Sequence, residues 1–249
     1  MPQPRYKEIY SDLKSSIESD IFTYQSLLPS ENMLCRQYDC SRSTVRRALS
    51  ELTSEGYIQP IQGKGVRVIW RPETDETTDY ATGGLDTFED TASRQGFEAT
   101  TKVRGFELMT VNEELAKKTS FALGESIYYI DRVRLANNFP VSIEFSYLLQ
   151  SEAPDLTEPD VEGSLYSYLE NEVGIEVTTG KRTITVERAT DDDLSVFGLE
   201  TLPAVGVMRG QHFDSNGTMF EYSEIRQHPS YFSVREVIAR HKGQAVYAA

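Results

Sequence analysis

Two arginines separated by one residue carry the first chemical signal in this 249-residue chain. Arg132 and Arg134 would point to the same face of a β-strand, because side chains alternate between the two faces of a strand. Two guanidinium groups on one face form a fork that suits a phosphate or a carboxylate group. The alternative is an ordinary cross-strand ion pair of these arginines with Glu144 or Glu221.

A serine that follows a glycine is a second candidate for binding an anion. Ser164 comes directly after Gly163 and precedes a predicted helix over residues 165–173. Its hydroxyl and the free N–H groups of a first helical turn suit an anion. A simple N-cap is the alternative, so neither this serine nor the arginine pair defines a binding site by itself.

Residues 42–55 combine basic and hydroxyl side chains with an apolar stripe. Four apolar residues recur at helical spacing and predict one buried face: Val45, Ala48, Leu49 and Leu52. Ser43, Arg46 and Arg47 fall on the opposite side, with Arg42 at its edge. Such a helix fits the major groove of DNA, where arginine can bind guanine and hydroxyl groups can hold phosphates. A solvated charged face is the alternative.

The elements around that helix favour DNA. Residues 6–17 carry a helical stripe, a second helix is predicted after Ser30, and Asp39-Cys40 makes the turn before the third helix. The hairpin 62–68 follows, with Lys64 between two glycines at its tip, where the chain could approach a phosphate. Helices and hairpin in this order predict a winged helix-turn-helix domain over residues 1–70.

This segment resembles the DNA-binding domain of GntR-type bacterial transcriptional regulators. The resemblance rests on Leu28-Pro29-Ser30-Glu31, Ser41 through Arg46, Gly56-Tyr57-Ile58 and Gly63-Lys64-Gly65. It implies DNA contacts at Arg42, Ser43, Thr44, Arg46, Arg47, Lys64 and Gly65. Asn32 departs from the pattern, because many members have arginine there, and operator affinity or base preference is expected to differ accordingly.

Charge is divided unevenly along the chain. The whole chain has a net charge of −14. Residues 1–71 carry ten basic and eight acidic residues, a net charge of +2, and the remainder carries −16. Because +2 is modest for a DNA-binding domain, we expect that a homodimer is needed for useful affinity and that binding weakens steeply with salt.

The two cysteines, Cys35 and Cys40, match neither a zinc site nor a disulfide framework. We expect no metal and no cofactor. The N-terminus has no apolar signal segment, and no apolar run approaches the length of a membrane span. These features predict a soluble cytoplasmic protein with no membrane partner.

Beyond a polar, acidic linker at residues 71–83, the pattern predicts a second domain over residues 84–242. Strands are predicted at 100–108, 127–135, 141–149, 183–189, 205–213 and 219–226. Helices are predicted at 88–94, 113–121, 165–173 and 191–197. Hairpins with interspersed helices predict an α/β domain on an antiparallel sheet, and the α+β class for the whole chain.

A weak internal repeat runs through this domain. Arg132 and Glu144 are twelve residues apart across a predicted turn, and so are Arg209 and Glu221. Each hairpin follows a short helix that begins in an acidic cluster. Duplication about a pseudo-twofold axis and chance similarity of two hairpins both account for the pattern.

Residues 84–240 resemble the effector domain (UTRA domain) of the HutC branch of GntR regulators, which is chorismate-lyase-like in fold. The matching pieces are residues 85–89, Arg132-Val133-Arg134, residues 140–148, Ser164-Leu165-Tyr166 and Glu221-Tyr222-Ser223. By this resemblance the effector site comprises Thr87, Phe88, Arg132, Arg134, Glu144, Ser164, Tyr166 and Glu221, the arginines and Ser164 on a phosphate and Tyr166 and Glu221 on a sugar. The chain looks most like the trehalose operon repressors, whose effector is trehalose 6-phosphate. Residues 226–232 depart from the usual ending of the family motif.

These resemblances imply a homodimeric repressor that binds a palindromic operator in double-stranded DNA and is released by a small phosphorylated sugar. An enzyme is one alternative, because the effector domain resembles a lyase fold, but His212, His228 and His241 show no motif that would organise catalysis. A DNA-binding dimer without an effector is the other alternative.

Overall fold

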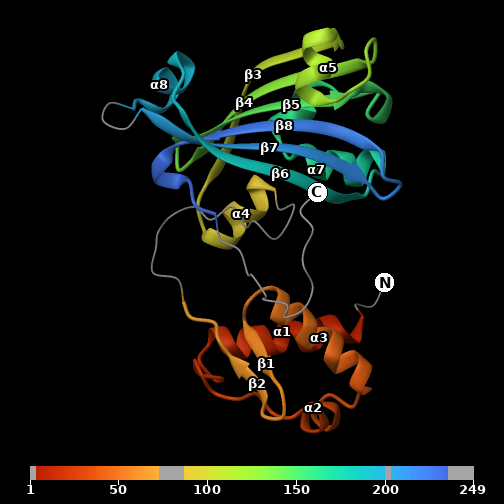
Figure 1. Ribbon diagram of the computed structural model, residues 1–249, viewed down its shortest axis with the longest axis vertical. Coiled ribbons are helices and arrows are strands. Elements are labelled where there is room, and N and C mark those ends of the chain that lie inside the picture. The colour runs from red at the N-terminus through yellow and green to blue at the C-terminus, as the bar shows by residue number, and fades with distance from the viewer. Residues whose placement is uncertain (1–3, 73–86, 200–202, 235–249) are drawn as a thin grey trace. The chain divides into compact units, whose positions relative to one another are not determined.

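The computed structural model describes residues 4–72, 87–199 and 203–234. They belong to an N-terminal and a C-terminal unit, each with its own hydrophobic core (Figure 1). From residue 73 onward the predicted linker lies outside the described residues, as do residues 84–86, 200–202 and 235–242 of the predicted second domain, including His241. The domain limits therefore stay predictions.

Three helices and a hairpin make up the N-terminal unit. Their bounds are α1 (Arg5–Glu18), α2 (Glu31–Gln37), α3 (Arg42–Ser54), β1 (Ile58–Ile61) and β2 (Gly65–Val68). Ser30 caps α2 and Ser41 caps α3, because each hydroxyl accepts a hydrogen bond from an N–H of the first turn. The helices bury the predicted stripes in one core: Ile9, Leu13, Ile17, Leu34, Val45, Ala48, Leu49 and Leu52.

The wing is a hairpin with a third segment added. β1 and β2 pair antiparallel with Ile61 opposite Gly65, and Gly63 and Gly65 have φ values of +73° and +104° that glycine adopts without strain. The N–H of Leu28 donates to the carbonyl of Val66 at 2.9 Å, so the chain before α2 pairs along β2. The wing is thereby tied to the helix-turn-helix.

A six-stranded antiparallel sheet forms the C-terminal unit, in the order β3-β4-β5-β8-β7-β6 (Figure 1). The bounds are β3 (Ala99–Thr110), β4 (Ser126–Ala136), β5 (Phe139–Leu149), β6 (Val177–Arg188), β7 (Ala204–Asp214) and β8 (Met219–Gln227). Asn137 and Asn138 both have positive φ in the two-residue turn between β4 and β5, as a type I′ hairpin requires.

Helices cover both faces of this sheet. They are α4 (Phe88–Gln95), α5 (Glu113–Thr119), α6 (Glu158–Glu162), α7 (Leu165–Tyr168) and α8 (Asp191–Phe197), with short turns η1 (Gln150–Glu152), η2 (Leu169–Val173) and η3 (Pro229–Tyr231). We call the face under α4, α6 and α7 the front face, and the face under α5 and α8 the rear face (Figure 1).

All six predicted strands and all four predicted helices of the second domain are present, with differences at their ends. β6 begins at Val177, six residues before the predicted start. Its first half is polar and exposed because β6 is an edge strand, so no alternation marks it. The five-residue α6 is an element that the sequence did not predict.

The two halves of the sheet repeat the same order of elements. β3, α5 and β4 begin 78 residues before β6, α8 and β7, at Ala99 and Val177, Glu113 and Asp191, and Ser126 and Ala204. β5 and β8 are central neighbours, so the halves are arranged about a pseudo-twofold axis. The predicted residue match is wrong by one position: the counterpart of Arg132 is Gly210, and Arg209 faces Glu224 rather than Glu221.

Candidate effector pocket and DNA-binding surface

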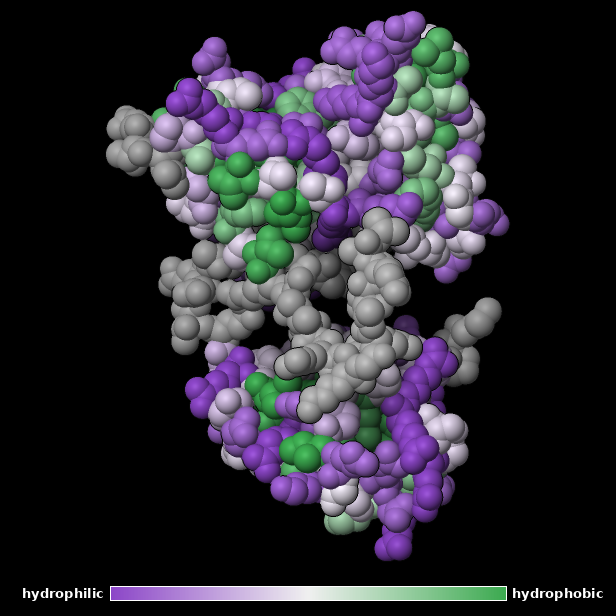
Figure 2. Space-filling view, viewed as in Figure 1, coloured by the Kyte–Doolittle hydropathy of each residue, from purple (hydrophilic) through white to green (hydrophobic). Residues whose placement is uncertain are grey.

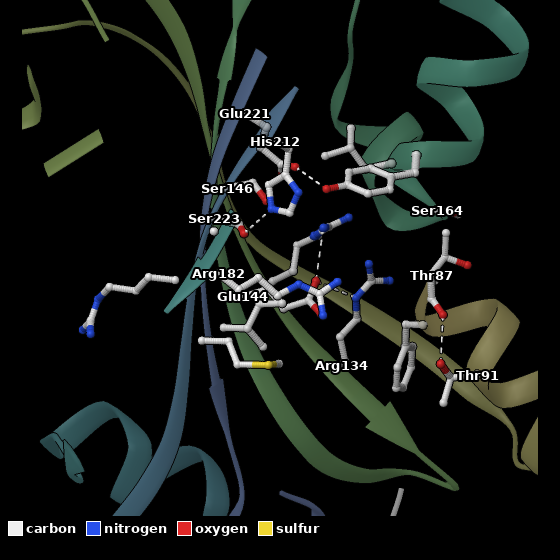
Figure 3. A pocket seen from close by; sticks show the side chains of 18 residues that line it. Thr87, Thr91, Arg134, Glu144, Ser146, Ser164, Arg182, His212, Glu221 and Ser223 are labelled. Atoms are coloured by element: carbon white, nitrogen blue, oxygen red, sulfur yellow. Dashed lines mark hydrogen bonds and ion pairs between the residues drawn. The ribbon is translucent and has the colours of Figure 1, made fainter. Parts of the chain in front are cut away.

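A pocket opens on the front face of the sheet (Figure 3). It encloses about 910 Å³, part of which is open to solvent, and side chains from α4, α7 and strands β4 to β8 line it. All eight residues of the predicted effector site meet here: Thr87, Phe88, Arg132, Arg134, Glu144, Ser164, Tyr166 and Glu221. Their role in binding a ligand stays a prediction.

The arginine pair projects from β4 and shares one carboxylate. Arg132 and Arg134 are each 4% exposed. An oxygen of Glu144 accepts hydrogen bonds from Arg132 Nη2 at 3.2 Å and from Arg134 Nε at 2.9 Å. Arg134 also donates to Glu89 at 3.0 Å and to Thr101 at 2.6 Å. The cross-strand ion pair, which the sequence left as an alternative to a pocket, is therefore present inside the pocket.

One nitrogen of Arg132 is left without a hydrogen-bond acceptor among the described residues. Burial and the neighbouring Arg134 lower the pKa of Arg132 to about 10, although Glu144 acts in the opposite direction. The pKa of Glu144 stays below its usual value despite burial, because both guanidinium groups favour the carboxylate. Arg132 Nε is buried and has no hydrogen-bond partner among the described residues. A bound anion would supply the missing acceptor.

Two capped helices present hydroxyl groups to the same end. Ser164 accepts a hydrogen bond from the Ser167 N–H at 3.2 Å, and Thr87 forms a capping box with Asp90 at the start of α4. The N-cap that the sequence left as an alternative for Ser164 is thus formed, and its hydroxyl still lines the pocket.

Tyr166, His212 and Ser223 line the pocket together with the carboxylate of Glu221. Tyr166 donates a hydrogen bond to Glu221 at 2.8 Å, and burial beside that carboxylate raises the pKa of the phenol. His212 Nε2 and Ser223 Oγ are hydrogen-bonded at 2.9 Å. The sequence did not predict His212, Ser223 or Arg182 as pocket residues. Strand alternation could have found the first two, but only with the register of β7 against β8.

The predicted DNA contacts lie on the exposed side of α3 and at the tip of the wing. Among them Thr44 is half-buried, and these are exposed: Arg42, Ser43, Arg46, Arg47, Lys64 and Gly65. Figure 2 shows the α3 surface as predominantly hydrophilic. These residues keep their DNA-binding role as a prediction.

The arginines of α3 differ in how they are held. Arg46 pairs with Glu31 of α2 at 3.0 Å, and the guanidinium of Arg47 lies 3.9 Å from the centre of the Tyr6 ring. Arg42 has no hydrogen-bond or ion-pair partner within the described part of the chain. Arg42 can therefore meet a base without first giving up a partner.

Comparison with known families decides what these two sites belong to. Residues 5–68 match the bacterial regulatory proteins of the gntR family, and residues 94–233 match the UTRA domain. The chain belongs to the GntR family. Its UTRA domain carries the pocket, and its GntR domain carries the exposed α3 surface.

Relatives of this GntR-family chain support the same assignment. The HTH-type transcriptional regulator TreR of Bacillus subtilis (strain 168) is 32% identical over 238 residues, which cover 96% of this chain and 98% of TreR. The solved effector-binding domain of the B. subtilis trehalose repressor covers 57% of this chain at 26% identity, with 99% of its own length matched and a TM-score of 0.52. The B. subtilis regulator YydK shares the fold over 96% of this chain and all of its own, with a TM-score of 0.77 and 22% identity. The protein is a DNA-binding transcription regulator.

In residues 4–72, 87–199 and 203–234, no cluster of His, Cys, Asp and Glu side chains could hold a metal ion. Within these same segments, no helix is long and apolar enough to cross a membrane.

Proposed function

We propose that this regulator is a cytoplasmic, homodimeric repressor of a sugar-utilisation operon, released from a palindromic operator by a phosphorylated sugar, with trehalose 6-phosphate as the first candidate. The observation that carries the proposal is the buried Arg132, which lines the pocket and whose Nε lacks an acceptor among the described residues. The trehalose repressor among the relatives makes a sugar phosphate the first ligand to test.

A phosphate group would complete the arginine end. One of its oxygens would accept from Arg132 Nε, while Ser164 and Thr87 offer hydroxyl groups that line the same pocket. A buried N–H group without an acceptor costs about 1–3 kcal/mol, and the ligand would recover this free energy on binding. The rest of the sugar would lie toward Tyr166 and Glu221.

Release from DNA would follow from a population shift. An effector that binds better to the conformation with low operator affinity favours that conformation. A coupling free energy of about 1–3 kcal/mol would weaken operator binding roughly 5- to 150-fold. No catalytic step is part of this proposal, and turnover of a sugar phosphate by the pure protein would contradict it.

The test starts from operator duplexes selected by the full-length protein from a random pool. Fluorescence anisotropy then measures operator affinity with trehalose 6-phosphate, glucose 6-phosphate, inorganic phosphate or trehalose. We expect weakening by a phosphorylated sugar, and none by trehalose. Arg42→Ala is the matched variant of the DNA side and should lose about 1–3 kcal/mol of operator binding while retaining effector binding. Operator affinity that no phosphorylated sugar changes would overturn the effector assignment.

A further inference from the structure

A histidine lines the pocket from the half of the sheet that does not carry Arg132. His212 projects from β7 and is 6% exposed. One ring nitrogen, Nε2, bonds Ser223, whereas Nδ1 is buried and has no hydrogen-bond partner among the described residues. Figure 3 shows the ring standing in the pocket beside Ser223. The Tyr166 ring lies edge-on to it, with 5.8 Å between the ring centres. A second unsatisfied polar atom therefore faces this cavity.

The pseudo-twofold repeat relates this histidine to the arginine end. With the offset of 78 residues, His212 is the counterpart of Arg134, and Gly210 is the counterpart of Arg132. Arg132 faces Glu144 across β5, and Gly210 faces Ser223 across β8, so Ser223 takes the place of Glu144. The Arg134–Glu144 hydrogen bond and the His212–Ser223 hydrogen bond are both 2.9 Å long. One half of the pocket holds a guanidinium–carboxylate pair, and the other holds an imidazole–hydroxyl pair.

Gly210 makes room for this arrangement. A Cβ atom at this position would lie 2.7 Å from His212 Nε2 and 3.2 Å from Ser223 Oγ. The imidazole therefore lies over the glycine backbone, where any side chain would displace it. The position of the His212 ring thus requires glycine at residue 210, the counterpart of Arg132.

The chemistry of this half differs from that of the arginine half. Burial lowers the pKa of His212, with Arg182 acting in the same direction and Glu221 against it, so the ring is neutral at neutral pH. A neutral imidazole has one donor and one acceptor. Because Nε2 is bonded to Ser223, Nδ1 offers the one function that remains, either donor or acceptor. A sugar hydroxyl can complement either of them, whereas an anion can only accept.

We propose that His212 is a specificity-determining residue that uses Nδ1, with Ser223, Glu221 and Tyr166 around it, to recognise hydroxyl groups of an uncharged sugar ring. The pocket would thereby select a ligand that has one anionic group and one uncharged sugar ring with several hydroxyl groups. The inference rests on the proposed function, because it assigns residues of the same pocket to the sugar part of the proposed ligand.

Two variants separate the ring nitrogens. Asparagine places its amide near the position of Nδ1, whereas glutamine places its amide near that of Nε2. Calorimetry with trehalose 6-phosphate, glucose 6-phosphate and inorganic phosphate would measure affinity for wild type, His212→Asn and His212→Gln. We expect His212→Gln to lose about tenfold in affinity for the better-bound sugar phosphate, the effect of one hydrogen bond, and His212→Asn to restore most of it. Affinity for inorganic phosphate should stay the same in all three proteins.

Gly210→Ala tests the role of His212 without replacing the histidine itself. The added methyl group would displace the ring, so this variant should lose sugar-phosphate affinity as His212→Gln does. Equal affinities of wild type and His212→Gln, or equal losses in the Asn and Gln variants, would overturn the role of Nδ1 and leave the proposed function standing. A wild-type protein that binds neither sugar phosphate better than inorganic phosphate would overturn both.

Discussion

Both faces of the effector sheet carry buried arginines beside carboxylates, but only the rear face satisfies them completely. On the rear face Arg226 bonds Asp193 of α8 at 2.7 Å and Glu224 at 3.2 Å, while Arg209 bonds Glu224 at 3.0 Å and also Glu187. Within the described residues, no buried polar atom of this rear cluster lacks a hydrogen-bond partner. On the front face, Arg132 and Arg134 share a single buried carboxylate.

This difference distinguishes a candidate ligand site from a structural ion cluster that is built of the same residue types. The rear cluster joins α8 to the sheet, and among the described residues none of its buried polar atoms lacks a partner. The front face leaves Arg132 Nε and His212 Nδ1 unsatisfied, and both residues line an open cavity. Buried polar atoms are normally paired, which is why we propose that a ligand in this cavity pairs with these two.

The largest expected effect breaks the rear cluster. Arg226→Ala would leave Asp193, which is fully buried, without its cation, whereas Glu224 would keep Arg209. We expect the free energy of unfolding of the effector domain to fall by about 3–5 kcal/mol, measured by urea denaturation. Arg132→Ala is the matched front-face variant and should cost less than half as much, because Glu144 keeps Arg134. Equal losses of unfolding free energy would mean that the front and rear arginines contribute equally to stability.

The next effect concerns binding. Arg132→Ala should remove about 1.5–3 kcal/mol of effector binding free energy, the range for hydrogen bonds to charged groups. The variant should stay on the operator at effector concentrations that release wild type, which anisotropy measures. Arg104→Ala on the rear face is the control and should bind effector as wild type does. Normal release of Arg132→Ala would place the anion elsewhere.

A smaller effect is expected at the exposed margin of the rear face. Arg104 bonds Asp131 and Asp192 at 2.8 Å, but the Asp192 side chain is 49% exposed. We expect Arg104→Ala to lower the free energy of unfolding by about 1 kcal/mol at most, since water screens such pairs. A loss as large as that of Arg226→Ala in the same urea experiment would show that burial does not set the strength of these pairs.

The smallest effect is a pH dependence of the front face. The pKa of His212 is lowered by burial in the folded state, so the unfolded chain binds its proton first as the pH falls through about 6.5. The free energy of unfolding should therefore decrease as the pH falls through this value, and level off below the folded-state pKa. Urea unfolding of His212→Asn should show a weaker pH dependence in this window than wild type. His228 also has a lowered pKa and should preserve part of the dependence in the variant. Identical pH profiles would contradict the burial of a neutral His212.

Sequence patterns predicted the elements of both units because local signals suffice for them. Ser30 and Ser41 before apolar stripes define α2 and α3, and the alternation at Arg132 and Arg134 places both on one face of β4. Register was not predictable, because pairing between β7 and β8 depends on contacts far apart in sequence. The spacing that matched Arg132 with Arg209 was off by one residue, so it did not point to His212, the true counterpart of Arg134.

Above all, we propose that a phosphorylated ligand bound in the front-face pocket controls operator binding. The most direct test measures the affinity of the wild-type protein for trehalose 6-phosphate with and without saturating operator duplex. Linkage requires the operator to weaken effector binding by the same factor by which the effector weakens operator binding, roughly 5- to 150-fold. Equal effector affinities in the two titrations, or binding that Arg132→Ala leaves unchanged, would contradict the account.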